Sequence, residues 1–240
     1  MSEYPLAVVT GAAHRLGKAF ALDLARHGYA VLLHFYADAQ AAYETADEIR
    51  ALDRPVFIQQ ADLTQPDQIK ALFDLVDTIP HPLKVLVNSA AELQRADAQT
   101  ITAAEWDAAF DLNLRAPFLL SQAAAQRMTE GGLIVNVSDV AAQKAWHVFP
   151  AYTVSKAALE SLTKVLARAL APTVRVNAIA PGLVLPSEIV SSEQWDKIIA
   201  RLPLQRAAHL SEITAALDYL LKNEYVTGQT LVVDGGYSLV

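Results

Sequence analysis

The chain of 240 residues is 53% hydrophobic and 19% charged, a composition that excludes extended disorder and indicates a globular protein. It contains no cysteine, which excludes disulfides, thiolate chemistry and cysteine-ligated metal sites. With 19 basic and 26 acidic side chains the net charge is −7, so nucleic acid is not expected as a partner. No run approaches the ~20 apolar residues that cross a bilayer and no cationic segment precedes Leu6, so we expect a cytoplasmic protein without membrane association.

Short apolar runs alternate with longer amphipathic stretches along the whole chain. The runs are rich in Val, Ile and Leu without polar alternation, which is typical of strands buried on both faces. They lie at Leu6–Thr10, Ala30–Phe35, Val56–Gln60, Lys84–Asn88, Leu133–Val137, Val174–Ile179 and Thr230–Val233. The repeated order of strand and helix predicts a single α/β domain over 1–240, a doubly wound, Rossmann-like parallel sheet of about seven strands with helices on both faces.

Two of the amphipathic stretches have the clearest helical periodicity. In the first, Leu16, Phe20 and Leu24 recur at helical spacing, and Gly28 follows as a C-terminal cap. The second apolar stripe consists of Ile69, Leu72, Phe73 and Val76.

The segment from Thr10 to Gly17, T-G-A-A-H-R-L-G, joins the first strand to the first helix. Gly11 permits a tight turn, and the helix amino terminus beyond it presents free N–H groups that suit a pyrophosphate. The dinucleotide pattern G-x-G-x-x-G is absent. The segment instead has the form T-G-x-x-x-R-x-G, with Arg15 at a position where a second glycine is expected. The alternative is that these glycines serve only the turn.

The end of the second strand indicates which dinucleotide would bind. An acidic residue there binds a ribose 2′-hydroxyl, whereas a basic one accommodates a 2′-phosphate. No carboxylate occurs until Asp38, Arg15 is a permanent cation, and His34 can add a hydrogen bond. These residues favour NADP(H) over NAD(H). Two alternatives stay open: Arg15 pairs with Asp38, and His34 is simply a packed strand residue.

Tyr152 and Lys156 are four residues apart in an expected helix at Ala151–Leu170, so their side chains share one face. A cation beside a phenol lowers the phenol pKa, so such a pair can donate a proton near neutral pH. The alternative is a surface tyrosine that packs on a lysine stem. The position favours chemistry, because the pair follows a buried strand and a loop that contains Ser138 and Asp139.

Six motifs in order along the chain together resemble the short-chain dehydrogenase/reductase family over essentially its whole length. They are Thr10-Gly11 to Gly17, Asn88-Ser89-Ala90, Asn113, Tyr152 to Lys156, Ala180-Pro181-Gly182 and Val233-Asp234-Gly235-Gly236. The resemblance implies an oxidoreductase with NADPH/NADP+ as its cofactor. The cofactor-binding residues it implies are Gly11, His14, Arg15, Leu16, His34, Asp62 (at the adenine), Leu63, Asn88, Ser89, Ala90, Tyr152, Lys156, Pro181 and Gly182.

Two departures from the family pattern resemble its pteridine reductases. The turn has the form T-G-x-x-x-R-x-G, and the catalytic serine expected thirteen positions before the tyrosine is Asp139. By this likeness, Asp139 and Tyr152 protonate a pterin ring while NADPH supplies hydride. Lys156 holds the nicotinamide ribose, and Asn113 supports a water near the lysine. A desolvated carboxyl has a raised pKa, which suits proton exchange with a basic heterocycle.

Asp139 also has two other interpretations. Ser138 is the donor if the loop is shifted by one residue, and Asp139 is an ordinary loop or capping acid if it faces solvent. In either case the enzyme would reduce ketones rather than pteridines.

The substrate side of the resemblance is less complete. Leu93 stands where pteridine reductases stack an aromatic ring on the pterin, and leucine lacks the π-face that makes stacking directional. Either Trp195, from an expected substrate loop at about 183–205, covers the ligand, or the substrate is not a pterin. Trp146, before the tyrosine, either lines the cleft or packs. Ala37 replaces a basic residue that often helps to bind the 2′-phosphate.

The expected reaction is therefore NADPH-dependent reduction of a dihydropterin or related pteridine, such as dihydrobiopterin, dihydromonapterin or dihydrofolate. The alternative is NADPH-dependent reduction of a ketone, such as a 3-oxoacyl thioester or a sugar. The resemblance also implies a homo-oligomer, a tetramer or dimer that forms through the long helices. The spacing of His14, His27, His81 and His209 matches no metal-ligand pattern, so no metal is expected.

Overall fold

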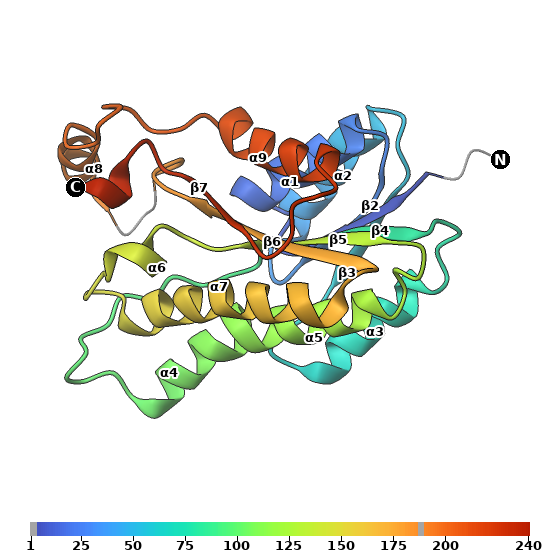
Figure 1. Ribbon diagram of the computed structural model, residues 1–240, viewed down its shortest axis with the longest axis horizontal. Coiled ribbons are helices and arrows are strands. Elements are labelled where there is room, and N and C mark those ends of the chain that lie inside the picture. The colour runs from blue at the N-terminus through green and yellow to red at the C-terminus, as the bar shows by residue number, and fades with distance from the viewer. Residues whose placement is uncertain (1–3, 187–189) are drawn as a thin grey trace.

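One parallel sheet of seven strands, in the order β3-β2-β1-β4-β5-β6-β7, runs through the middle of the molecule (Figure 1). The computed structural model describes residues 4–186 and 190–240. The strands are β1 Leu6–Val9, β2 Ala30–Phe35, β3 Val56–Gln60, β4 Leu83–Asn88, β5 Gly132–Val137, β6 Val174–Pro181 and β7 Thr230–Val233. Every run expected to be a strand is one, and the strand order confirms the doubly wound α/β class.

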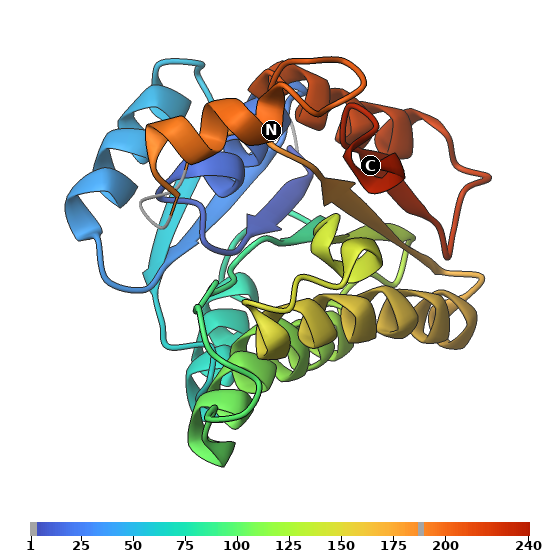
Figure 2. The same cartoon turned by 90° about the vertical axis from the view of Figure 1, so that its left-hand side faces the viewer.

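Helices cover both faces of this sheet (Figures 1 and 2). On one face lie α1 Arg15–Arg26, α2 Ala39–Arg50 and α9 Leu210–Lys222. On the other lie α3 Pro66–Val76, α4 Ala103–Phe110, a π-helical turn at Asp111–Arg115, α5 Ala116–Ala125 and α7 Pro150–Leu170. The shorter α6 Ala141–Lys144, α8 Ser192–Ile199 and the 3-10 turn Tyr237–Leu239 gather at the end that carries the carboxyl terminus.

The central strands show no polar alternation because apolar layers bury both of their faces, whereas the edge strands β3 and β7 are only partly buried, contrary to the expectation for every strand. In β1, Ala7 and Val9 belong to the core cluster on the side of α1 and α9, whereas Leu6 and Val8 belong to the cluster on the side of α3 and α5. All four side chains are fully buried. Each buried valine or leucine contributes about 1.5–3 kcal/mol of transfer free energy, so this sheet is the stable base on which the loops are held.

The helix signals are confirmed with small shifts of boundary. Phe20 and Leu24 are fully buried on α1, and Gly28 follows that helix with φ +91°. The helix expected from Ala151 begins one residue earlier, at Pro150, because proline is well tolerated in the first turn of a helix.

The strand order reverses between β1 and β4, and ligands of such sheets bind at the carboxyl ends of the strands beside this reversal. The turn at Gly11, the segment at Ser89 and the loop at Asp139 all follow carboxyl ends of central strands. The fold therefore brings these three predicted segments to one edge of the sheet. In the described part of the chain, no helix combines the length and the apolarity needed to cross a membrane.

Candidate active site

The turn after β1 presses against the segment after β4. Gly11 has φ +63°, and a Cβ at this position would lie 2.9 Å from the Cα of Ala90. Thr10 reinforces the contact, because its Oγ1 accepts hydrogen bonds from the backbone N–H groups of Ser89 and Ala90, each at 3.0 Å. The motif analysis missed this role of Thr10, although a hydroxyl next to the turn glycine was a visible signal. The cradle leaves the amino terminus of α1 free for a phosphate group.

His34 corrects one expectation. The side chain is 1% exposed; its Nδ1 accepts from Gly11 N–H at 3.2 Å, and its Nε2 donates to the carbonyl of Ala61 at 3.0 Å. Both ring nitrogens are therefore used inside the protein, and burial lowers the pKa to about 4, so the imidazole is neutral. His34 therefore fixes the turn at Gly11 from inside the protein, which is the packed-residue alternative, and does not offer a hydrogen bond to a phosphate.

Arg15 links the turn after β1 to the segment that follows β6. Its guanidinium donates to the carbonyl oxygens of Pro186 at 2.9 Å and Leu185 at 3.0 Å, in the segment that follows β6. It is His14, not Arg15, that pairs with Asp38, at 3.1 Å. Arg15 is exposed and has five N–H donors, so it can hold this segment and still face a 2′-phosphate.

Asp139 and Tyr152 meet directly. The Tyr152 hydroxyl donates to Asp139 Oδ2 at 2.8 Å, and the other carboxylate oxygen accepts from the backbone N–H of Ala141 at 2.7 Å. The loop after β5 therefore directs this carboxyl toward the tyrosine, not into bulk solvent. The expected arrangement of acid and phenol is present.

Burial sets the protonation of this pair. It raises the pKa of Asp139, although the Ala141 N–H, the Tyr152 hydroxyl and the charge of Lys156 oppose the rise. Burial also raises the pKa of Tyr152 well above its usual value, and the Asp139 carboxylate adds to the increase. This corrects the expectation that the lysine lowers the phenol pKa, because the acid accepts the phenol's hydrogen bond at closer range. Tyr152 is a neutral hydroxyl, and Asp139 is the group that can gain or lose a proton.

Lys156 lies beneath the pair. Its Nζ donates to the backbone carbonyl of Val137 at 2.7 Å and lies 5.6 Å from the centre of the Tyr152 ring. Burial lowers the pKa of Lys156 to about 8, and the charge of Asp139 opposes that change. The lysine is thus a buried cation that favours the ionised form of the carboxyl close by.

Ser138 faces away from this group. Its Oγ donates to Glu160 Oε1 at 3.0 Å and, at 3.4 Å, to the backbone carbonyl of Lys156. The side chain is 3% exposed and committed to these oxygens. The alternative in which Ser138 is the proton donor is therefore wrong for this loop register.

Asn113 lies in the π-helical turn Asp111–Arg115, a conformation that is frequent at functional sites. Its side chain accepts from Glu92 N–H at 3.0 Å, and donates to Glu92 O at 3.1 Å and to Ser155 Oγ at 3.1 Å. It therefore fixes the segment after β4 to α7. The role expected for Asn113, support of a water near the lysine, stays a prediction.

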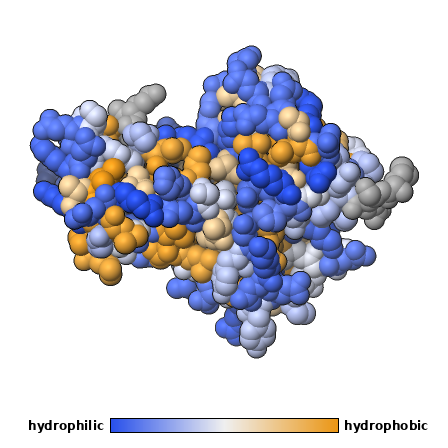
Figure 3. All heavy atoms as spheres, turned by 90° about the horizontal axis from the view of Figure 1, so that it is seen from above, coloured by the Kyte–Doolittle hydropathy of each residue, from blue (hydrophilic) through white to orange (hydrophobic). Residues whose placement is uncertain are grey.

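An apolar cluster adjoins Tyr152 on the substrate side. It contains Phe149, with Leu93 and Trp146 packed against it. Trp146 thus lies beside the site, whereas Trp195 is half-buried on α8. In the view from above, apolar surface gathers at the end of the molecule that carries α8 (Figure 3).

Tyr237 is a site neighbour that the motif analysis missed. Its ring centre lies 6.0 Å from that of Trp146, and the charge of Asp139 helps to raise its pKa, after burial. The only available signal was its place directly after the closing Asp-Gly-Gly motif.

The remaining predicted residues line the same edge with different roles. The Asn88 side chain donates to Asn136 Oδ1 at 2.8 Å, which ties β4 to β5 inside the sheet. Asp62 accepts from the backbone N–H and the hydroxyl of Thr64, directly after β3. The position of Asp62 thus suits the adenine contact, which stays a prediction.

The carboxyl end of β6 is equally close-packed. Pro181 O accepts from Val140 N–H at 3.0 Å, and a Cβ on Gly182 would lie 2.7 Å from the Cα of Asp234. Leu16 and Leu63 pack on the core on opposite faces of the sheet, so any cofactor contact of theirs would be through the backbone.

Known proteins resemble this chain from end to end. The sequence model of a family described as enoyl-(acyl carrier protein) reductase matches residues 11–238. The chain is 32% identical over 237 residues to the 3-oxoacyl-acyl-carrier-protein reductase FabG of Staphylococcus aureus, with 96% of each chain covered.

Solved structures have the same fold. FolM alternative dihydrofolate reductase 1 from Brucella suis, in complex with NADP, has 36% identity and a TM-score of 0.93, covering 99% of this chain and 96% of that one. Acetoin dehydrogenase from Enterobacter cloacae has 32% identity and a TM-score of 0.91, covering 100% and 97%.

The chain belongs to the short-chain dehydrogenase/reductase family, as its six motifs predicted. It is an oxidoreductase that uses a nicotinamide cofactor, which the glycine cradle between β1 and β4 can receive.

Proposed function

We propose that this protein reduces a dihydropterin or related pteridine with NADPH. The observation that carries the proposal is the 2.8 Å hydrogen bond from Tyr152 to Asp139, in a family whose usual partner for the tyrosine is a serine. A ketone oxygen needs only a neutral hydroxyl, whereas a ring nitrogen is better served by a carboxyl such as Asp139, whose pKa is raised by burial. The likeness to a FolM dihydrofolate reductase supports the same chemistry.

Reduction of a ring C=N bond needs one hydride at carbon and one proton at nitrogen. When bound, the reduced nicotinamide supplies the hydride. Asp139 takes up a proton from solvent, and its O–H then donates to the phenol oxygen of Tyr152. The Tyr152 hydroxyl is thereby turned toward the substrate nitrogen and releases its proton there, while the carboxyl returns a proton to the phenol. Lys156 would hold the nicotinamide ribose, and its charge stabilises the negative charge that the carboxyl carries afterwards.

A preference for NADPH over NADH belongs to the same proposal and depends on Arg15. This guanidinium is exposed beside the cofactor turn, and Ala37 offers no carboxylate to bind a 2′-hydroxyl. His34 no longer contributes, so Arg15 is the cation that recognises the 2′-phosphate. The NADP in the FolM structure supports this choice.

We assign substrate binding to the segment 183–205. Residues 187–189 of it lie outside the described residues. Arg15 contacts its first part, and α8 with Trp195 forms its second. With Leu93 at the aromatic position, Trp146 beside Tyr152 is a nearer ring than Trp195 to cover a pterin.

The deciding experiment follows NADPH absorbance with purified protein and either dihydrobiopterin or acetoacetyl-CoA. We expect oxidation with the pteridine. Asp139→Ser, which restores the family's usual residue, should lower pteridine turnover more than any ketone turnover. Oxidation with the thioester alone would overturn the pteridine proposal.

A ketone substrate is the second candidate, because specific observations favour it. The relatives include an oxoacyl reductase and an acetoin dehydrogenase at 32% identity each, and Leu93 lacks a stacking face. In that case Tyr152 alone would protonate the oxygen.

We also propose that the protein is a homo-oligomer. An apolar groove of about 500 Å³ runs between the π-helical turn, α5 and α7, on the face away from α1. Phe118 is 40% exposed and Val165 61% exposed beside it. A second copy would bury these side chains, because exposed apolar patches of this kind mark interaction surfaces.

A further inference from the structure

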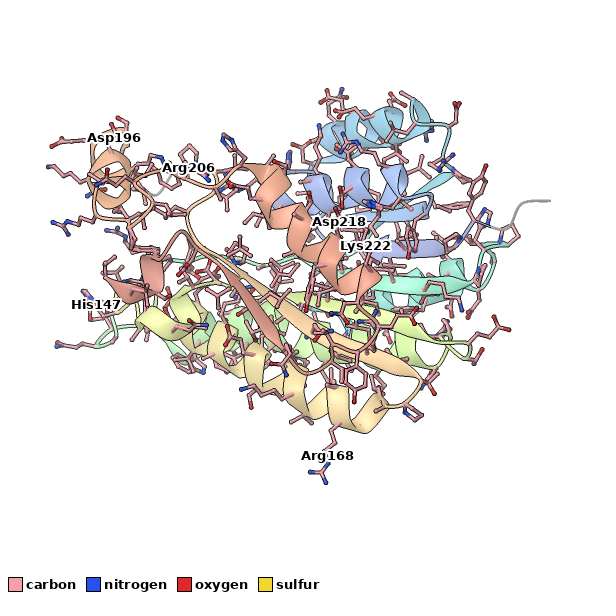
Figure 4. All side chains as sticks on the ribbon, turned by 45° about the horizontal axis from the view of Figure 1, so that its top comes forward. His147, Arg168, Asp196, Arg206, Asp218 and Lys222 are labelled. Atoms are coloured by element: carbon pink, nitrogen blue, oxygen red, sulfur yellow. The ribbon has the colours of Figure 1, made fainter. Side chains whose placement is uncertain are left out.

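Three potential metal ligands converge between α1 and α9, on the face of the sheet opposite α7. Asp23 lies in the last turn of α1, His27 directly follows that helix, and Asp218 extends from α9, which lies alongside α1 (Figures 1 and 4). One ligand atom from each of the three side chains lies within 4.8 Å of the others. This cluster has no part in the nicotinamide chemistry described above.

Two oxygens of the cluster have no hydrogen-bond donor in the described structure. Asp23 is 8% exposed, and its Oδ2, which points into the cluster, is both buried and unpartnered. Oδ1 of Asp218 is also buried and unpartnered. A buried carboxylate oxygen without a donor is costly, so a positive group between the two carboxylates would stabilise this arrangement.

The histidine offers a third lone pair. His27 Nδ1 lies 2.9 Å from the backbone carbonyl of Asp23 and therefore donates to it. In the neutral ring Nε2 then carries the lone pair, and it lies 3.2 Å from Asp218 Oδ1. Metal-ligating histidines commonly donate their other ring N–H to a carbonyl in this way.

We propose that Asp23, His27 and Asp218 bind a divalent transition-metal ion such as Zn²⁺, which links α1 to α9. Two carboxylates and a neutral imidazole match the charge of such an ion, and Zn²⁺ is commonly bound by these ligand types. Tetrahedral ligands at about 2.0–2.1 Å lie roughly 3.3 Å apart, a separation that the side chains reach by small rotations from their present positions. Water occupies the remaining coordination, since the His27 side chain is 33% exposed.

The prediction of no metal from histidine spacing fails for a clear reason if this proposal holds. That prediction considered only the spacing between histidines, whereas this cluster contains one histidine and two aspartates. The pair Asp23 and His27 has helical spacing, but the third ligand lies almost two hundred residues later in the chain, on a helix that the sheet brings alongside.

The test is thermal unfolding of chelator-treated protein at about pH 8, with and without Zn²⁺, in the absence of nicotinamide cofactor. This pH is above the pKa of about 6 to which burial and Asp218 raise Asp23, so the Asp23 carboxylate is ionised. A ligand at 100 times its Kd should raise the Tm of a chain of this size by roughly 5–10 °C. Co²⁺ should give the visible absorption bands of a low-symmetry site.

Asp23→Asn and His27→Gln should lose both the Tm increase and the Co²⁺ bands. Asp74→Asn is the matched control, because it removes one carboxylate from an exposed i,i+4 pair on α3 and should respond like the wild type. An equal Tm increase in Asp23→Asn, or none in the wild type, would overturn the proposal. A carboxyl pair that shares a proton would give the second result, with stability that depends on pH and not on Zn²⁺.

Discussion

At the scale of single residues, Asp139 changes what the neighbouring tyrosine can do. With serine in that place, a lysine next to a phenol lowers the phenol pKa and makes it the titrating acid. Here burial raises the pKa of Tyr152, the charge of Asp139 and the hydrogen bond that it accepts from the phenol add to the rise, and the carboxyl becomes the titrating group. The protonation state of the buried carboxyl thus determines whether a proton can be transferred to the substrate.

Asp139→Ala should lower pteridine turnover by about tenfold or more while NADPH binding persists, because a positioned acid contributes roughly 10²–10⁴-fold. Ser138→Ala is the matched control one residue away, and it should change turnover little, since that hydroxyl faces Glu160. Steady-state kinetics and fluorescence titration with NADPH check both. Comparable losses in the two variants would show that the loop as a whole, not the carboxyl, matters.

The pH profile separates these variants further. Turnover requires protonated Asp139, whose pKa is raised by burial, so activity should be full below that pKa and decline as the pH rises through it. The decline that this carboxyl causes should disappear in Asp139→Ala and persist in Ser138→Ala, whereas a decline near pH 8, where Lys156 loses its charge, should remain in both variants.

At the scale of elements, His34 connects the carboxyl ends of three neighbouring strands. From β2 it binds Gly11 after β1 and Ala61 after β3. The cofactor turn is thus held by a neutral buried imidazole, whose protonation would remove the acceptor that Gly11 N–H needs.

This makes the fold sensitive to acid. The pKa of His34 falls from 6.5 to about 4 on folding, so the unfolded chain takes up the proton first. The stability that depends on the neutral ring is complete above about pH 6.5 and is lost as the pH falls toward 4. When the pH falls from 7 to 5, the unfolding free energy of the wild type should therefore decrease by about 2 kcal/mol more than that of His34→Gln. Urea unfolding at both pH values measures this difference, and parallel declines would contradict it.

Arg15 connects two other elements, the turn after β1 and the segment after β6. Arg15→Gln should weaken NADPH binding by at least about tenfold and NADH binding far less, because only NADPH has the 2′-phosphate that a guanidinium binds. Calorimetric titration with both cofactors checks this. Arg50→Gln, which removes an exposed guanidinium that pairs with Asp47 on α2, is the control. Equal losses for the two cofactors in Arg15→Gln would remove Arg15 from the phosphate site.

At the scale of the whole molecule, the sheet was predictable because its signals are local. Seven apolar runs, each bounded by turns, specify the seven strands, of which the edge strands β3 and β7 are only partly buried. The motif at Thr10 marks the reversal of strand order. Asp139 and Tyr152 were placed together by the resemblance to the family, whose catalytic serine lies thirteen positions before the tyrosine. The directions of the His34 and Ser138 side chains were not predicted. The direction of a buried polar side chain depends on partners such as Ala61 and Glu160, which the sequence does not reveal.

The π-helical turn at Asp111–Arg115 shows the same limit. One extra residue in a helical turn leaves no mark in an apolar periodicity that continues on either side. Its effect, the inward direction of Asn113, is visible only in the assembled structure.

The apolar groove between α5 and α7 leads to a prediction about assembly. Val165→Asp should convert the oligomer into smaller species, because a charge at the centre of an apolar contact would be buried without a partner. Light scattering during size-exclusion chromatography gives the mass, and NADPH titration shows whether the fold persists. Tyr43→Asp is the control, since Tyr43 is 55% exposed on α2, on the opposite face of the sheet. An unchanged mass for Val165→Asp would show that this groove is not where two copies meet, and the apolar surface near α8 would then be the next to test.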